Sequence, residues 1–103
     1  MEETKKLLTE VIEFYGADMQ LNICIEEMSE LIKELCKAKR GNPDMNHIAE
    51  EMADVKIIME QLSIIFENDN EVNGWYEKKI QRLRSRLDED KIRLYIPNVE
   101  ISF

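Results

Sequence analysis

The spacing of the apolar residues limits what this chain can fold into more than any other feature. Over most of the sequence these residues recur every three or four positions, which places them on one side of an α-helix. Residues with a high helix propensity dominate, and the chain has only three glycines and two prolines. The sequence therefore predicts an all-α fold.

Breaks in the pattern divide the chain into helices. Gly16 separates the first two, Gly41 ends the second, and Asn42 and Asp44 are equally good N-caps for the third. Because the connections are short, we expect sequential antiparallel neighbours in a four-helix bundle-like domain. We expect one domain over residues 1–103, whose helices cover residues 4–15, 19–40, about 44–67 and 71–88.

The end of the chain follows a different pattern. Apolar and polar residues alternate from Ile92 to Ile96 and again from Val99 to Phe103, with Pro97 between the two runs. A period of two is typical of extended chain. We therefore expect a short extended C-terminal arm over about residues 91–103, which lies on the bundle, pairs with itself or pairs with a second subunit.

Charge and hydropathy limit the partners of the protein. A net charge of −8 argues against binding a nucleic acid polymer through a basic surface, although a small anionic ligand held by a metal stays compatible with it. No stretch reaches the roughly 18 apolar residues of a membrane span, and the first residues do not resemble a signal peptide. We therefore expect a cytoplasmic protein without a membrane segment.

The cysteines and the histidine offer little for zinc. Cys24 and Cys36 lie twelve residues apart in one expected helix. Their Cα atoms are then about 18 Å apart, too far for a disulfide. His47 is the single histidine of the sequence. Zinc is therefore not expected.

Two short acidic stretches stand inside the expected helices. Residues 26–30 read Glu-Glu-Met-Ser-Glu, and residues 50–54 read Glu-Glu-Met-Ala-Asp. Carboxylates three residues apart share one face of a helix. If the two helices lie side by side, four carboxylates converge, and they repel one another unless a cation lies between them. Oxygen ligands alone favour the hard cations Mg²⁺ and Mn²⁺.

The acids of the second expected helix lie beside its apolar stripe. On a helical wheel the stripe centres on Met28 and Leu35. Glu27 lies at the edge of the stripe, and Glu30 and Glu34 lie just outside it. We expect the stripe to face the core and these acids to reach toward a neighbouring helix from its side.

The acids of the third expected helix lie inside an apolar arc. Glu51 and Asp54 fall within this arc, which covers most of the circumference and marks a central or interface helix. An ionised carboxylate there is costly unless it is paired or binds a metal. The main apolar row of this helix consists of Ile48, Met52, Val55, Met59, Leu62 and Phe66.

A purely structural role for the acids stays open. They could form salt bridges in a non-catalytic helical oligomerisation or regulatory module, with Lys33, Lys37, Lys78, Lys79 and Arg82 as partners. A di-iron bundle is disfavoured, because it needs Glu-x-x-His motifs on two helices.

The paired acidic pattern resembles a known signature. Glu-Glu-x-x-Glu at residues 26–30, followed after about twenty residues by Glu-x-x-Asp at 51–54, is similar to the motif of the MazG-like, all-α nucleoside triphosphate pyrophosphatases. Phe14-Tyr15-Gly16 with Gln20-Leu21 resembles the segment upstream of that motif, and residues 77–83 resemble the basic last helix. The likeness covers about residues 5–88.

This resemblance implies a reaction and an assembly. The family hydrolyses nucleoside triphosphates between the α- and β-phosphates, releasing a monophosphate and pyrophosphate. The reaction depends on Mg²⁺, with Mn²⁺ as a possible substitute, and the bundles assemble as dimers or tetramers. Since this chain carries one copy of the motif, a homodimer or homotetramer is expected. A different phosphohydrolase, acting on a non-nucleotide phosphate ester, is a further possibility.

The resemblance also implies roles for particular residues. Glu26 would orient the attacking water or support a metal ligand. The metal ligands would be Glu27, Glu30, Glu51 and Asp54. The phosphate contacts would be Lys78, Lys79 and Arg82. The base pocket would be lined by Tyr15, Gln20 and Trp75.

Overall fold

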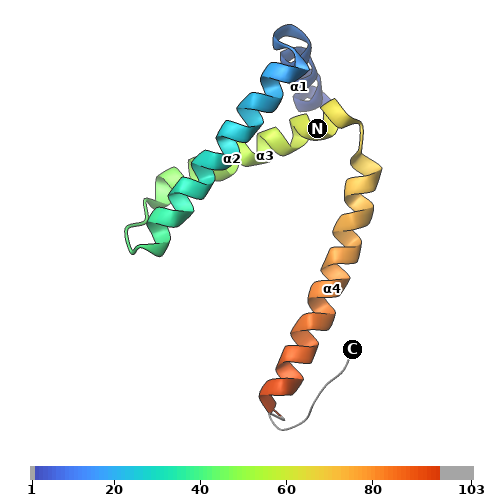
Figure 1. Ribbon diagram of the computed structural model, residues 1–103. Coiled ribbons are helices and arrows are strands. Elements are labelled where there is room, and N and C mark those ends of the chain that lie inside the picture. Colours follow the sequence, from blue (N-terminus) through green and yellow to red (C-terminus); the bar gives the residue numbers. More distant parts are fainter. Residues whose placement is uncertain (1, 96–103) are drawn as a thin grey trace. The chain divides into compact units, whose positions relative to one another are not determined.

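The computed structural model describes residues 2–95, which form four helices joined by short turns, with no strand among them. The all-α fold expected from the apolar spacing is confirmed. Within the described range the structure divides into two units, residues 2–67 and residues 68–95. The expectation of a single domain stays a prediction. The helices, labelled in Figure 1, are α1 (Glu2–Tyr15), α2 (Ala17–Lys39), α3 (Met45–Phe66) and α4 (Asp69–Tyr95).

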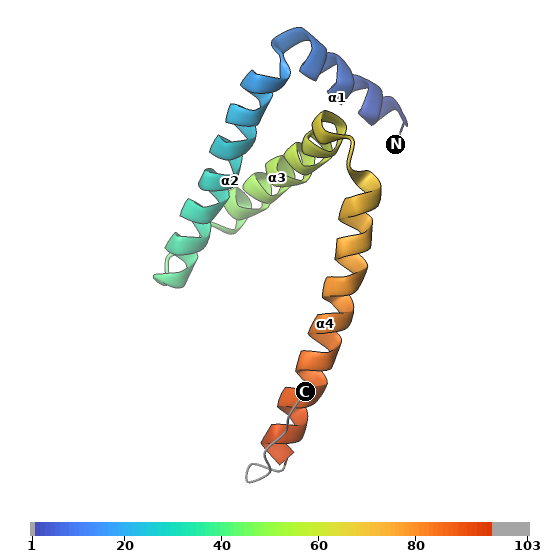
Figure 2. The same ribbon diagram turned by 45° about the vertical axis from the view of Figure 1, so that its right-hand side comes forward.

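Gly16 joins α1 to α2 with almost no linker. Its N–H donates to the carbonyl of Ile12 (2.8 Å), and its own carbonyl accepts from the N–H of Gln20 (3.1 Å). The backbone has φ +93° and ψ 145°, a conformation that side chains with a Cβ rarely adopt. The glycine thus allows the last bond of one helix and the first bond of the next to form at a sharp change of direction, which is visible in Figure 2.

Backbone geometry also explains the turn between α2 and α3. Gly41 has a positive φ of 85°, and the N–H of Asn42 reaches back to the carbonyl of Lys37 (3.1 Å), as in a Schellman turn. Of the two possible caps for α3, the structure uses Asp44. Its Oδ1 accepts from the backbone N–H of His47 at 3.0 Å. This turn brings α3 back along α2.

Helices α2 and α3 pack antiparallel, and α1 packs against both. Contacts between α2 and α3 run in opposite directions along the two helices, joining Gln20 to Gln61, Cys24 to Ile58, and Glu34 to His47. Among the buried residues of this unit, three side chains are apolar and four are polar or charged. They are Leu8, Cys24 and Ile58, with Gln20, Glu34, Glu51 and Gln61.

The expectation that the apolar stripe of α2 faces the core holds only at one edge of the stripe, where Cys24 is buried. Met28 is exposed, and about half of Leu35 is exposed (49%). Glu34, expected just outside the stripe, is instead the most buried charged residue, with 1% of its surface accessible. A helical wheel finds the apolar side of a helix but not what covers it. Here the side that packs on α3 is rotated toward the acids at one edge of the stripe, and it carries Gln20, Cys24 and Glu34.

Helix α4 is longer than the sequence predicts. The expected fourth helix ends at Asp88, whereas α4 continues to Tyr95, so residues 91–95 are helical and not extended. An ion pair one turn apart, from Arg93 to Glu89 (2.7 Å), contributes to this last part of the helix. The alternation that suggested an extended arm spans too few residues to exclude a helix. The rest of the expected arm, residues 96–103, lies outside the described residues.

None of the helices in the described range is long and apolar enough to span a membrane.

Candidate metal centre

Three of the four expected metal ligands come together between α2 and α3. Glu27 of α2 and Glu51 and Asp54 of α3 each place a carboxylate oxygen within 4.8 Å of the others. The three-residue spacing puts the two α3 acids on one face, and the antiparallel packing sets Glu27 opposite them. Glu51 is buried, while Glu27 and Asp54 are partly buried. The inward position of Glu51 and Asp54 agrees with their place in the apolar arc, although Met52 and Met59 of the same arc are exposed in this unit.

Glu30, the fourth expected ligand, lies at the margin. Glu30 is exposed and is not part of the close group formed by Glu27, Glu51 and Asp54. Its negative charge nevertheless acts on Glu27. Glu30 therefore borders the site on the solvent side.

The electrostatics of Glu27 reflect this crowding. Burial raises the pKa of its carboxyl above the ordinary value of 4.5. A side-chain hydrogen bond with Asp54, and then the negative charges of Asp54, Glu51 and Glu30, raise this pKa further. Without a cation, the group therefore favours a proton on Glu27.

The donor set fits a divalent cation. Oε2 of Glu51 is buried and accepts no hydrogen bond from any described residue. Within the described part of the chain, no lysine forms an ion pair with Glu27, Glu51 or Asp54. A buried carboxylate oxygen without a partner is costly. Oxygen ligands alone match the preference of Mg²⁺.

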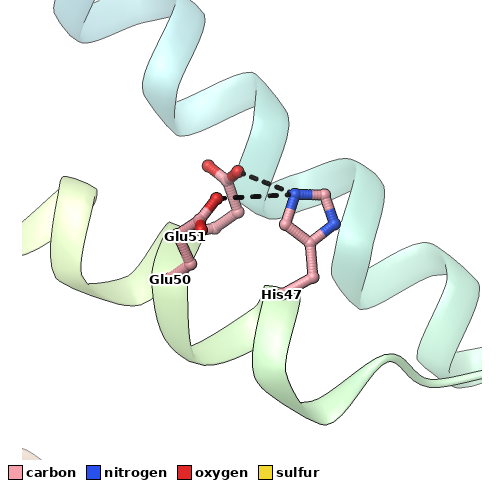
Figure 3. A group of neighbouring side chains, drawn as sticks. All are labelled: His47, Glu50 and Glu51. Atoms are coloured by element: carbon pink, nitrogen blue, oxygen red, sulfur yellow. Dashed lines mark ion pairs between the residues drawn. The ribbon is translucent and has the colours of Figure 1, made fainter.

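A second polar group, which the sequence does not predict, surrounds His47 on the first turn of α3. Its Nδ1 lies 3.3 Å from Oε2 of Glu34, across on α2. On the other side of the ring, Nε2 lies 3.2 Å from Oε1 of Glu51 and 3.9 Å from Oε1 of Glu50 (Figure 3). The one sequence feature that could have indicated this group is the spacing of His47 and Glu51, which lie four residues apart and so on one face of the helix.

Other expected site residues of the first unit lie outside both groups. Glu26 is exposed, and its backbone carbonyl accepts from Oγ of Ser29 (2.7 Å). Gln20 is buried, and its Oε1 accepts from Nε2 of Gln61 (3.2 Å). Tyr15 is exposed and packs edge-to-face on Phe14, with ring centroids 4.8 Å apart.

The remaining expected residues stand on α4, in the second unit. Lys78, Lys79 and Arg82 are exposed there, as is Trp75. Nζ of Lys78 lies 5.1 Å from the ring centroid of Trp75, within the range of a cation–π interaction. Their expected roles in phosphate and base binding stay predictions.

Comparisons of this chain with known protein families, with curated proteins and with solved structures found no match. The likeness to the MazG-like pyrophosphatases therefore rests on the paired acidic motif and stays a prediction.

Proposed function

We propose that this protein is a Mg²⁺-dependent nucleoside triphosphate pyrophosphohydrolase. The observation that carries the proposal is the convergence of Glu27, Glu51 and Asp54 between two packed helices. These carboxylates repel one another, and a buried oxygen of Glu51 has no hydrogen-bond partner among the described residues. Such an arrangement is costly without a cation, so a function that uses one explains why these residues are present.

The proposed reaction is hydrolysis of a (d)NTP. Water breaks the bond between the α- and β-phosphates, and the products are (d)NMP and pyrophosphate. Glu27, Glu51 and Asp54 hold the cation, and Glu30 completes the ligands from the exposed side. Mg²⁺ at this position supplies positive charge against the triphosphate and lowers the pKa of a bound water. Mn²⁺ has a similar preference for oxygen ligands and is the expected substitute.

The other proposed roles follow the sequence motif. Glu26 is exposed on α2 and is assigned to orient the attacking water. Phosphate contacts are assigned to exposed cations of α4, Lys78, Lys79 and Arg82. Tyr15, Gln20 and Trp75 are assigned to the base pocket. Gln20 is the weakest of these assignments, because its carbonyl oxygen already accepts from Gln61.

A homodimer or homotetramer is part of the proposal. The apolar stripe of α2 is exposed in this unit, and large apolar side chains of α3 are exposed as well. Apolar patches of this kind on a single chain mark interaction surfaces. The side chains that a second copy would cover are Ile25, Met28, Ile32 and Leu35 of α2, and Met52, Ile57, Met59 and Phe66 of α3. A cytoplasmic location, where nucleotides are abundant, belongs to the same proposal.

The test is pyrophosphate release from a panel of nucleotides, with Mg²⁺, with Mn²⁺ and with chelator. We expect turnover that requires the metal and falls on the order of 100-fold in Asp54→Asn, because a negatively charged ligand is lost and the cation is held less tightly. Glu60→Gln, an exposed change on the same helix, is the matched control and should leave the rate unchanged. The proposal fails if no nucleotide is hydrolysed, or if Asp54→Asn is as active as the wild type.

One observation favours the non-catalytic alternative. Buried Glu34 lies 3.4 Å from Nζ of Lys37 and 3.3 Å from His47, so one acid of this layer already has structural partners. A structural module predicts that replacing Glu51 and Asp54 with Ala and Leu stabilises the protein, and that Mg²⁺ does not change its melting temperature. Analysis of the products distinguishes the proposed pyrophosphohydrolase from a phosphohydrolase that acts on a non-nucleotide phosphate ester.

A further inference from the structure

The two nitrogens of the His47 ring face different carboxylates. Nε2 has Oε1 of Glu51 at 3.2 Å and Oε1 of Glu50 at 3.9 Å, and these ligand atoms lie within 4.8 Å of one another (Figure 3). Ligand atoms about 2.0–2.2 Å from a zinc ion in a tetrahedral site lie roughly 3.4 Å apart. The two distances from Nε2, 3.2 and 3.9 Å, are therefore close to the spacing that a bound ion would impose.

The opposite side of the ring is oriented by Glu34. Oε2 of Glu34 lies 3.3 Å from Nδ1, and the residue is almost fully buried at 1% exposed. A histidine that binds a metal almost always directs its other ring N–H to a carboxylate or carbonyl. A proton on Nδ1 is attracted by Glu34 and leaves the lone pair of Nε2 pointing toward Glu50 and Glu51.

The charges of the group are not balanced by the side chains that face it. Lys37 lies against Glu34 at 3.4 Å and accounts for that carboxylate. Glu50 and Glu51 then face one imidazole, which carries at most a single positive charge. Glu51 is 6% exposed, and its Oε2 has no hydrogen-bond partner among the described residues. Because Glu51 belongs to both groups, this buried, unpartnered oxygen indicates a cation at its carboxylate.

We propose that Nε2 of His47, with the carboxylates of Glu50 and Glu51, forms a second metal site that takes a transition-metal cation such as Zn²⁺. A nitrogen and two oxygens suit such an ion better than Mg²⁺, which prefers oxygen ligands. Glu50 is exposed, so the fourth position opens to solvent and can take water or a ligand. The site shares Glu51 with the Glu27–Asp54 group but does not depend on nucleotide hydrolysis.

His47 provides a direct spectroscopic test because it is the single histidine of the sequence. Zn²⁺ is titrated into the full chain while the two imidazole nitrogens are followed in a long-range ¹H–¹⁵N spectrum. We expect the Nε2 resonance to shift, Nδ1 to keep its proton, and Mg²⁺ to produce neither change. Coordination through Nδ1, or no change at either nitrogen, would overturn the proposal.

Calorimetric titration with Zn²⁺ assigns the ligands. Glu34→Gln should weaken Zn²⁺ binding about 10–100-fold through loss of the group that orients the ring. His47→Gln should abolish saturable binding. Glu50→Gln changes an exposed residue and so decides the matter if the His47 variant does not fold. Glu60→Gln is the control. Wild-type affinity in Glu50→Gln would also overturn the proposal.

One further variant separates this site from the proposed magnesium site. Asp54→Asn should lose Mg²⁺ binding and keep Zn²⁺ binding, because Asp54 belongs only to the group with Glu27. Zn²⁺ binding by a protein that hydrolyses no nucleotide would support this inference and count against the proposed function. Loss of Zn²⁺ binding in Asp54→Asn to the same degree as in His47→Gln would contradict two separate sites.

Discussion

At the scale of one residue, the packing of α2 on α3 changes the protonation of Glu27. Burial and the neighbouring acids raise the pKa of its carboxyl, so the folded protein holds a proton there more tightly than the unfolded chain does. Stability from this group is fully present below the ordinary value of 4.5 and is lost as the pH rises through the raised pKa. Above this pKa, the proposed metal ligand Glu27 therefore destabilises the folded protein when no metal is bound.

Replacing this carboxyl gives the first prediction. In chelator, the wild type should lose stability as the pH rises above 4.5 and through the raised pKa of Glu27, and Glu27→Gln should lack this loss. Urea unfolding at a series of pH values measures both curves. Parallel curves would show that Glu27 does not carry the raised pKa. Glu10→Gln, an exposed acid on α1, is the control.

Gly16 gives a second prediction at this scale. A Cβ at this position would meet no atom within 4 Å, so the cost of Gly16→Ala comes from the backbone alone, at φ +93°. We expect a loss of about 1–3 kcal/mol in the free energy of unfolding. Gly74→Ala is the matched control, since it also has free space but sits inside α4. It should raise helical stability by about 0.5–1 kcal/mol. Equal effects of the two changes would contradict the assigned role of Gly16.

At the scale of the helices, the inward polar face that joins α2 to α3 is the main feature. Gln20 and Gln61 pair there at 3.2 Å, and both are buried. Gln61→Leu leaves Oε1 of Gln20 unpaired and should cost about 1–3 kcal/mol. Changing both residues to Leu should be nearly neutral, because neither leaves a buried polar group without a partner. Denaturant unfolding of the wild type, the two single variants and the double variant checks this. If the two single losses in the free energy of unfolding add up in the double variant, the pairing is contradicted.

The sequence predicts helix ends well where a local backbone rule applies. Gly41 and Asp44 mark the turn between α2 and α3 because a positive φ and an N-cap need those residue types. The end of α4 is not predicted, since the alternation near Ile92 also fits a helix that the Glu89–Arg93 ion pair supports. Local rules identify helices, but packing decides which side of each is covered.

The candidate site is predicted in part for the same reason. The inward position of Glu51 and Asp54 follows from the apolar arc of their own helix. Burial of Glu34 does not, because it depends on α3 packing against the side of α2 that carries Gln20, Cys24 and Glu34. The role of His47 depends on that packing as well as on its spacing from Glu51.

At the scale of the whole molecule, the exposed apolar stripe of α2 requires a partner in our proposal. Ile32 is 60% exposed and lies on this stripe. Ile32→Lys should convert a dimer or tetramer into monomers, because a desolvated charge at an apolar interface is costly. Sedimentation analysis measures the mass. Asn22→Lys, which adds the same charge at an exposed polar position of α2, should not change it. A monomeric wild type would contradict the oligomer.

The central claim is that the acids between α2 and α3 are there to hold a divalent cation. The most direct test is the melting temperature of the metal-free protein before and after Mg²⁺ is added. At a concentration about 100 times the dissociation constant, binding should add about 2.7 kcal/mol, roughly 10–20 °C for a chain of this size, and Asp54→Leu should show no such rise. An unchanged wild-type melting temperature, with Asp54→Leu more stable than the wild type, would contradict the claim.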